Sequence, residues 1–487
     1  METGLPFAFQ QETRKLMGEQ LWKVLSDNID EPPVTSVRLN MPKCGNMRID
    51  TTVAHSPVAW CRHSYYVEKR PNFTLDPLMH AGAYYVQEAS SMFVEYCLDY
   101  ALEALRKDGL ESPSLVLDLC AAPGGKSLIL RDTLPASCLL FSNEPIRQRA
   151  NILAENIIKH GNPDVVVTNN YAKDYVNAGL MFDIILCDVP CSGEGMFRKD
   201  EKARTEWSLE NVSRCQKLQR EILEDIWKCL RPGGMLIYST CTFNALENED
   251  NIEWIAKELG GDVMNLDVPR EWNVTGSLKG SHPSYRFIPG VSKGEGLFMA
   301  VIKKSGIISD IKQPLTISKG KKSRKKSKDM KKGGASIETG LNSCKEWLSN
   351  PECYDTRTIK DEIIAIRKEW ADIYDYLSDK LSIIRFGTSL ATIKGGKTKP
   401  SHSLAMSRCM DMQAFPSVEI DIEQATEYLR KESLTLSPDI PKGYVTLKFN
   451  GIPIGFVNNL GVRANNLYPQ EWRIKTTHVS EPTSILK

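Results

Sequence analysis

Between residues 114 and 304, short apolar runs alternate with amphipathic helical patterns, and this alternation constrains the fold more than any other feature. The runs SLVLDL (114–119), CLLFSNE (138–144) and DVVVTN (164–169) are largely apolar, as buried parallel strands are. Strands that alternate with helices in this way predict a doubly wound α/β fold with a mostly parallel sheet.

The chain is too long for one compact domain, and its composition changes along its length. It has 487 residues, of which 41% are hydrophobic and 25% charged, as in ordinary globular proteins. The net charge of +1 conceals a basic run at 319–332, which is either a solvated segment or a contact to nucleic-acid phosphates. We predict five parts: a small α+β domain at 1–112, the doubly wound sheet at 113–305, a basic flexible linker at 306–340, a helical or mixed region at 341–431 and a small β domain at 432–487.

The cysteines and the apolar runs limit the cellular setting. The 13 cysteines are scattered, without a CxxC pair or the Cys and His spacing of a zinc site, so no metal is expected. Free thiols are usual in a reducing cytosol. No run approaches the roughly 20 apolar residues of a membrane span, and the start lacks the features of a signal peptide. We therefore predict a cytoplasmic protein without a membrane partner.

The stretch LDLCAAPGGKS (117–127) follows the first strand of the sheet and opens a helix, which is where α/β sheets bind cofactors. Its two adjacent glycines permit a tight turn, and the helix start presents free N–H groups. Glu144 ends the next strand, where a carboxylate can bind the hydroxyls of a ribose. The pair indicates a nucleoside-containing cofactor, although the stretch is neither GxGxxG nor a phosphate-binding GxxxxGK(S/T). The alternative is a turn with incidental glycines.

Two cysteines follow two neighbouring strands. FDIILCDV (182–189) is an apolar strand that carries Asp188 near its end, and Cys191 lies just beyond it. YSTCT (238–242) ends the next strand and carries Cys241. Because neighbouring strands are about 4.8 Å apart, both thiols are expected on the same edge as the cofactor loop. A lone cysteine at a strand end is usually a small buried hydrophobe, but two beside an aspartate suggest chemistry.

A thiol, an acid and a nucleoside cofactor suit attack on an electron-poor ring. Cytosine C5 is not nucleophilic, but addition of a thiolate to C6 makes C5 enamine-like, and an acid at N3 stabilises the adduct. C5 can then accept a methyl group, and loss of its proton and of the thiolate completes the cycle. This chemistry needs a nucleophile, an acid and a base, for which the chain offers Cys191, Cys241 and Asp188.

Three motifs together resemble those of one enzyme family. CAAPGGKS (120–127), DVPCSGEGMFRK (188–199) and YSTCTFNALENED (238–250) are similar to motifs of the Sun-type RNA (cytosine-C5) methyltransferases. The GEGMFRK continuation resembles the bacterial 16S ribosomal RNA methyltransferase F branch, and the likeness covers nearly all of the chain. It implies a Rossmann-like methyltransferase sheet, a small N-terminal RNA-binding domain and a PUA-like C-terminal RNA-binding domain.

The resemblance also implies site residues and partners. S-adenosyl-L-methionine would be the methyl donor, Cys241 the covalent nucleophile and Cys191 the group that assists release of the methylated RNA. Asp188 would hold the N3/N4 edge of the cytosine and lie near the cofactor, while Tyr468 is either an RNA contact or a packing residue. The partner would be small-subunit ribosomal RNA or an assembling 30S particle, bound by a monomer. The cofactor would be bound by Cys120, Ala121, Ala122, Pro123, Gly124, Gly125, Lys126, Glu144 and Asp188, and RNA by Arg38, Asn40, Lys126, Asn466 and Arg473.

Two positions depart from the family pattern. Tyr171 stands where the family usually has an aspartate on the adenine side of the cofactor, so Tyr171 stacks on adenine, or Asn170 supplies the hydrogen bond, or the affinity is lower. Gly290 stands where a histidine is often found. The first departure leaves open a ribosome-assembly RNA-binding factor without turnover. A DNA cytosine-C5 methyltransferase is disfavoured, because those enzymes use the Pro-Cys thiol as nucleophile and lack a second cysteine on the next strand.

Overall fold

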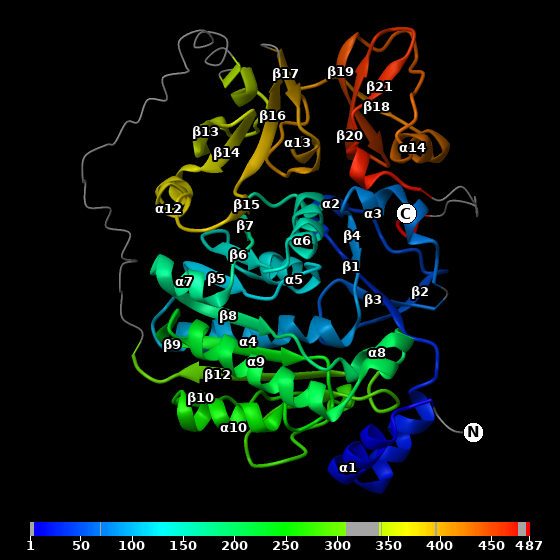
Figure 1. The fold of residues 1–487 in the computed structure, drawn as a ribbon. Helices are drawn as coiled ribbons and strands as arrows, with labels where there is room; N and C mark the ends of the chain where they lie inside the picture. Colours follow the sequence, from blue (N-terminus) through cyan, green and yellow to red (C-terminus); the bar gives the residue numbers. More distant parts are fainter. Residues whose placement is uncertain (1–3, 69, 308–339, 342, 395–396, 476–483) are drawn as a thin grey trace, which may run out of the picture.

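The computed structural model describes residues 4–68, 70–307, 340–341, 343–394, 397–475 and 484–487 (Figure 1). The strands of these residues form four sheets, of which the central one is the largest. No helix in the described part of the chain is long and apolar enough to cross a membrane. The basic run at 319–332 and most of the predicted linker lie outside the described residues.

The N-terminal part is a four-stranded sheet with a long helix beside it. The strand order is β2-β3-β1-β4, and β1 is antiparallel to both of its neighbours. Helix α1 packs Phe9 against Phe197 and Trp207, with ring centroids 5.0 and 5.7 Å apart, and so covers the loop that follows Cys191. The elements are α1 Phe7–Asn28, β1 Thr35–Leu39, α2 Met41–Cys44, β2 Ala54–Pro57, β3 Ser64–Val67, α3 Pro77–His80 and β4 Tyr84–Val86.

The central sheet confirms the predicted doubly wound α/β fold. Its strand order is β10-β12-β9-β8-β5-β6-β7-β15, with β11 paired to β12. The strands from β9 to β7 in this order are parallel, and the winding reverses between β5 and β8. Ligands bind at the carboxyl ends of the strands where the order reverses. The strands are β5 Leu115–Asp118, β6 Leu139–Asn143, β7 Val165–Thr168, β8 Phe182–Asp188, β9 Leu230–Thr240, β10 Gly261–Val263, β11 Tyr285–Phe287 and β12 Leu297–Lys304.

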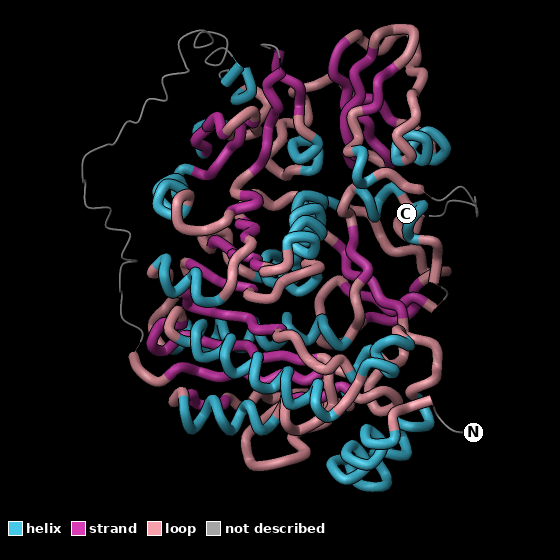
Figure 2. The backbone as a smooth tube through the Cα atoms, viewed as in Figure 1, coloured by secondary structure: helices cyan, strands magenta, loops and turns pink. Residues whose placement is uncertain are grey.

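Helices cover both faces of this sheet (Figure 2). Alternate residues of a strand point to opposite faces, so Ile184 packs in the apolar cluster of α4, α5 and α6, whereas Ile185 packs in that of α7, α9 and α10. Two apolar layers therefore hold the strand ends that carry the site. The helices are α4 Val94–Lys107, α5 Gly125–Thr133, α6 Arg147–His160, α7 Ala172–Ala178, α8 Glu201–Glu206, α9 Leu209–Trp227 and α10 Glu249–Glu258.

The region at 341–431 contains a sheet where helical patterns dominated the prediction. The segment 358–377, inside the region predicted to be helical or mixed, includes the end of β13, all of β14 and only then α12. Lys360 has a φ of 55°, which turns the chain between two strands, and Ile363 to Ile366 are buried in the sheet β13-β14-β16-β17. The elements are β13 Tyr354–Ile359, β14 Glu362–Arg367, α12 Ala371–Leu377, β15 Ile383–Arg385, β16 Thr388–Lys394, β17 Lys397–Pro400 and α13 His402–Met406.

Strand β15 belongs to the central sheet, although the strands before and after it in sequence, β14 and β16, belong to another sheet. It pairs antiparallel with β7, with Ile383 opposite Thr168. The region predicted to be separate from the methyltransferase-like sheet therefore supplies one of its edge strands.

The last sheet begins before the boundary predicted at residue 432. Its order is β18-β19-β20-β21, and β18 is hydrogen-bonded in parallel to β19. The hairpin between β19 and β20 turns at Asn450 and Gly451, whose φ values of 50° and 76° are those of an Asn-Gly hairpin turn. The elements are β18 Ser417–Glu419, α14 Ile422–Leu429, β19 Gly443–Phe449, β20 Ile452–Asn459 and β21 Ala464–Asn466.

Candidate active site

The predicted cofactor loop joins β5 to α5 at the point where the strand order reverses. Gly124 has a φ of 119°, a conformation that side chains rarely adopt, and it caps the start of α5. A Cβ on Gly125 would lie 3.0 Å from the Tyr85 ring and 3.1 Å from the Gln87 amide. The two glycines are therefore required by the turn and by close contact with the N-terminal part.

Two buried carboxylates beside this loop each have an oxygen without a hydrogen-bond partner among the described residues. Asp118 Oδ2 accepts from Ser127 Oγ (2.6 Å), and its Oδ1 has no partner. Glu144 Oε1 accepts from Ile146 N (3.0 Å), and its Oε2 has only the Arg149 guanidinium at 3.4 Å. Buried acceptors are normally satisfied. These oxygens therefore fit the hydroxyl and amino donors of a nucleoside cofactor, and Asp118, which ends its strand, is a candidate that the sequence analysis missed.

We expect Asp118 to make the ligand-free protein less stable as the pH rises from about 4 to about 7. Burial, and then the charges of Asp188 and Glu144, raise the pKa of Asp118 from 3.8 to about 7. The unfolded chain loses this proton at a lower pH than the folded chain does, so the stability linked to Asp118 is lost between the two pKa values. Urea unfolding at several pH values measures this loss. In Asp118→Asn the change in the free energy of unfolding between pH 4 and pH 7 should be smaller by up to about 4 kcal/mol. The exposed Asp262→Asn is the control, and an unchanged slope in Asp118→Asn would contradict the raised pKa.

Asp188 ends β8 and is held from two sides. Lys126 Nζ donates to Asp188 Oδ2 (2.7 Å), and Ser239 Oγ, on β9, donates to Oδ1. Burial lowers the pKa of Lys126, but the charge of Asp188 and the hydrogen bond to it raise that pKa by more, so Lys126 stays a cation. The side chain of Asp188 is still 31% exposed. It can therefore meet a ligand while Lys126 holds its orientation.

The structure brings Cys191 and Cys241 together at the ends of β8 and β9. Their Sγ atoms are 3.1 Å apart, well beyond the roughly 2.05 Å of a disulfide, so both are free thiols. The hydrogen bond with Cys241, then burial, then the charges of Cys241 and Glu247 raise the pKa of Cys191 well above its usual value. The positive charge of Lys126 also interacts with Cys241. Cys191 therefore keeps its proton in the free protein. Cys241 is the thiol that interacts with the Lys126 cation.

Two buried glutamates tie together the loops that carry the cysteines. Glu194 Oε2 accepts from the backbone N–H groups of Phe243 (2.6 Å) and Asn244 (2.9 Å). Glu247 Oε2 accepts from Ser192 N (3.0 Å), and its Oε1 accepts from Asn244 Nδ2 (2.8 Å). Each loop therefore supplies a carboxylate to donors of the other loop. The sequence analysis missed both residues, and their only signal was their place inside the second and third motifs.

Glu194→Ala should lower the free energy of unfolding by about 3–5 kcal/mol, because it leaves buried N–H groups of Phe243 and Asn244 without an acceptor. The midpoint of urea unfolding, followed by tryptophan fluorescence, measures this loss. Glu210→Ala, at an exposed position in the first turn of α9, is the matched control and should change stability by less than about 0.5 kcal/mol. A loss below about 1 kcal/mol for Glu194→Ala would show that the loops do not depend on this carboxylate.

The two residues that could replace the family's usual aspartate differ in their surroundings. Asn170 is buried, and its Oδ1 accepts from Ser382 N (3.1 Å), next to β15. Tyr171 is the N-cap residue that precedes α7, and it is 71% exposed. Only Tyr171 therefore has an exposed side chain, whereas the amide of Asn170 holds the edge strand.

The residues predicted to contact RNA fall into two groups. Arg38 is buried and pairs with Asp132 (2.8 Å), and Asn40 is buried and donates to the Gly82 carbonyl (2.7 Å). Both residues are held by protein partners and also line one pocket beside α6, so their contact with RNA stays a prediction. In the last sheet the amide of Asn466 donates to two backbone carbonyls, Tyr468 is buried in the core, and Arg473 is exposed.

Comparison with solved structures defines the class of the fold. The chain resembles a methyltransferase homologue from Pyrococcus horikoshii, with a TM-score of 0.51 and 24% identity over 62% of this chain and 96% of that one. It also resembles NSun6 from the same organism, solved with SFG, with a TM-score of 0.52 and 17% identity over 63% of this chain and 100% of that one. These likenesses show a Rossmann-like fold, and the sequence matches to methyltransferase families make the chain an S-adenosylmethionine-dependent methyltransferase.

Comparison of sequences identifies the family. Family models match residues 5–89 (N-terminal domain of 16S rRNA methyltransferase RsmF), 108–303 (16S rRNA methyltransferase RsmB/F) and 415–474 (methyltransferase RsmF PUA domain). The chain is 28% identical over 427 residues to ribosomal RNA small subunit methyltransferase F of Klebsiella pneumoniae, covering 85% of this chain and 84% of the relative. The Escherichia coli enzyme of that name is 29% identical over the same length. The chain belongs to the RsmB/F family of 16S rRNA methyltransferases, which confirms the resemblance seen in the three motifs.

Proposed function

We propose that this chain transfers a methyl group from S-adenosylmethionine to C5 of a cytosine in small-subunit ribosomal RNA. The observation that carries this proposal is the pair of free thiols, 3.1 Å apart, beside the Lys126–Asp188 ion pair. The open acceptors of Asp118 and Glu144 support a cofactor site beside the thiols. The names of the curated relatives support the choice of substrate.

The cysteines divide the chemistry between them. Cys241 Sγ attacks C6 of the cytosine, which makes C5 nucleophilic, and Asp188 holds the N3/N4 edge of the base. The cofactor supplies its methyl group as the electrophile. In the adduct Cys191 first gives its own thiol proton to solvent and then takes the proton from C5. The C5 electrons restore the C5–C6 double bond, and the Cys241–C6 bond breaks with its electron pair returning to the sulfur, which releases the methylated RNA. The loop from Cys120 to Lys126, with Glu144, holds the cofactor.

The charge on Cys241 explains how Cys191 can act late in the cycle. The hydrogen bond to Cys241 and the negative charge of Cys241 raise the pKa of Cys191 in the free enzyme, together with burial. When Cys241 becomes a thioether, that charge disappears and the acceptor is weaker. The pKa of Cys191 therefore falls in the adduct, at the stage when a base is needed at C5.

The division of the chain supports RNA binding at its two ends. We propose that the N-terminal part (1–112) and the PUA-like sheet at the C-terminus hold the RNA while the central sheet carries the chemistry, with Arg473 as an exposed contact. All of the thiols and carboxylates of the site come from one chain, which supports a monomer acting on ribosomal RNA or an assembling 30S particle. Reactive free thiols are best preserved in the reducing cytoplasm.

The experiment that tests this function offers the full chain small-subunit RNA, free and within assembling particles, together with S-adenosylmethionine. Mass spectrometry of the digested RNA should find new 5-methylcytosine. DNA of the same sequence should remain unmodified, and methylation of DNA alone would favour the DNA enzyme instead. Absence of methylation on every RNA form would favour an assembly factor that binds RNA without turnover.

A further inference from the structure

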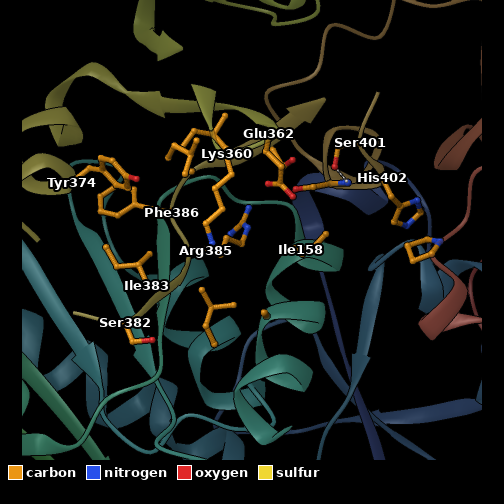
Figure 3. Close-up of a pocket in the computed structure, with 18 of the residues that line it drawn as sticks. Ile158, Lys360, Glu362, Tyr374, Ser382, Ile383, Arg385, Phe386, Ser401 and His402 are labelled. Atoms are coloured by element: carbon orange, nitrogen blue, oxygen red, sulfur yellow. Dashed lines mark hydrogen bonds between the residues drawn. The ribbon is translucent and has the colours of Figure 1, made fainter. Parts of the chain in front are cut away.

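A cavity of about 670 Å³ lies between the central sheet, the sheet β13-β14-β16-β17 and the C-terminal part (Figure 3). Its walls come from α6, β14, β15, the start of β16, α13 and the segment around Trp472. The volume is within the range of pockets that hold small ligands. None of the residues assigned to the methyl-transfer site lines this cavity.

Arg385, at the end of β15, is a buried cation in this cavity without a counter-ion. Its exposed fraction is 9%, and Figure 3 shows its guanidinium directed into the space below Lys360 and Glu362. Arg385 Nη1 donates only a long hydrogen bond to the Val165 carbonyl (3.4 Å), and its Nε has no partner in the described part of the chain. A buried charge is normally paired. None of the described residues therefore supplies the anion that Arg385 would normally pair with.

The carboxylates nearest to Arg385 do not meet this need. Asp164 is bound to Arg367 (3.0 Å) and to Trp370 Nε1 (3.2 Å), and it forms no ion pair with Arg385. Glu362 and Glu471 line the cavity but are exposed, so their charges are screened by solvent. Ion pairs between Arg385 and either of them are absent among the described residues.

Other polar groups of the cavity are also unsatisfied. The hydroxyls of Ser389 and Ser403 are buried without a hydrogen-bond partner in the described structure. Both ring nitrogens of His402 lack a partner as well, and Figure 3 shows this residue at the end of the cavity away from Tyr374. Together with Arg385 these groups form a polar side that can bind phosphate and hydroxyl oxygens.

The opposite end of the cavity is aromatic and apolar. Tyr374 and Phe386 line it and meet edge to face, with ring centroids 5.3 Å apart. Ile383 lies beside them in Figure 3. Nucleobases stack on such aromatic walls, whereas an inorganic anion makes no favourable contact with them.

We infer that this cavity binds a nucleotide, with its phosphate on Arg385 and its base against Tyr374 and Phe386. The nucleotide is either free or part of the RNA, outside the cytosine that is methylated, and the second source rests on the proposed function. One hydrogen bond connects the cavity wall to the end of β7, because Ser382 lines the cavity and Ser382 N donates to Asn170 Oδ1 (3.1 Å).

The test compares the full chain with three variants, using inorganic phosphate, cytidine 5′-monophosphate and a short single-stranded RNA as probes. Arg385→Gln removes the cation, and Ser389→Glu keeps Arg385 but places a carboxylate in the cavity. Lys380→Gln removes a nearby exposed cation that stacks over Tyr376 and does not line the cavity. Calorimetry measures binding of the small probes, and fluorescence anisotropy at several salt concentrations measures binding of the RNA.

Nucleotide binding should weaken at least tenfold in Arg385→Gln and Ser389→Glu and stay unchanged in Lys380→Gln. If the RNA is the source, Arg385→Gln also weakens RNA binding and lowers the salt slope by about one. If RNA binding is unaffected while the mononucleotide is lost, the ligand is a free nucleotide. Equal affinity of the unmodified protein and both cavity variants for every probe would overturn the inference. Methyl transfer is not measured, so the result stands whether or not the proposed function does.

Discussion

Cys241→Ala is expected to lower methyl transfer by at least about a thousandfold, because it removes the thiol proposed to form the bond to C6. The neighbouring thiol is a poor substitute, since the pKa of Cys191 is raised well above its usual value. The variant should also form no complex with RNA that survives denaturation. Incorporation of labelled methyl groups and denaturing gel electrophoresis measure the two effects.

The control for this variant is Cys353→Ala, which removes an exposed free thiol outside the central sheet. It should retain methyl transfer within about twofold, because surface and half-buried substitutions away from a site usually have small effects. Substantial methylation by Cys241→Ala, combined with an inactive Cys191→Ala that forms no adduct, would reverse the two roles. The thiol after β8 would then be the nucleophile.

The central fold and the meeting of the two thiols follow from local patterns. Runs such as Val165 to Thr168 are buried throughout, so their apolar character alone predicts interior strands. Parallel strands place their carboxyl ends at one edge, which brings residues 50 positions apart, Cys191 and Cys241, into contact. No tertiary information beyond strand order was needed for this part of the site.

The rest depends on contacts that leave no local signal. Arg38 follows the alternation of a strand, but its partner Asp132 is 94 residues away, so its burial could not be read from its neighbours. Strand β15 has three residues and is fixed by pairing with β7, more than 200 residues earlier. Glu194 and Glu247 look like ordinary surface charges until the loops close around them. In each case a distant partner, not local propensity, determines the environment.

The same dependence on a partner makes Cys191→Ala the sharpest test of the mechanism. In the proposed adduct Cys241 is a thioether, so the hydrogen bond to it and its charge no longer raise the pKa of Cys191, although burial still does. Cys191 can then lose its own proton and take the one from C5. Without this base the Cys241–C6 bond cannot break, so turnover should fall by roughly 100- to 10,000-fold while a denaturation-resistant protein–RNA adduct accumulates. Mass spectrometry of the adduct should locate the RNA on Cys241, and the double variant Cys191→Ala/Cys241→Ala should form none. Normal turnover of Cys191→Ala without an adduct would mean that another group removes the proton from C5. If Cys191 is the base, the variant must instead stay bonded to the RNA through Cys241.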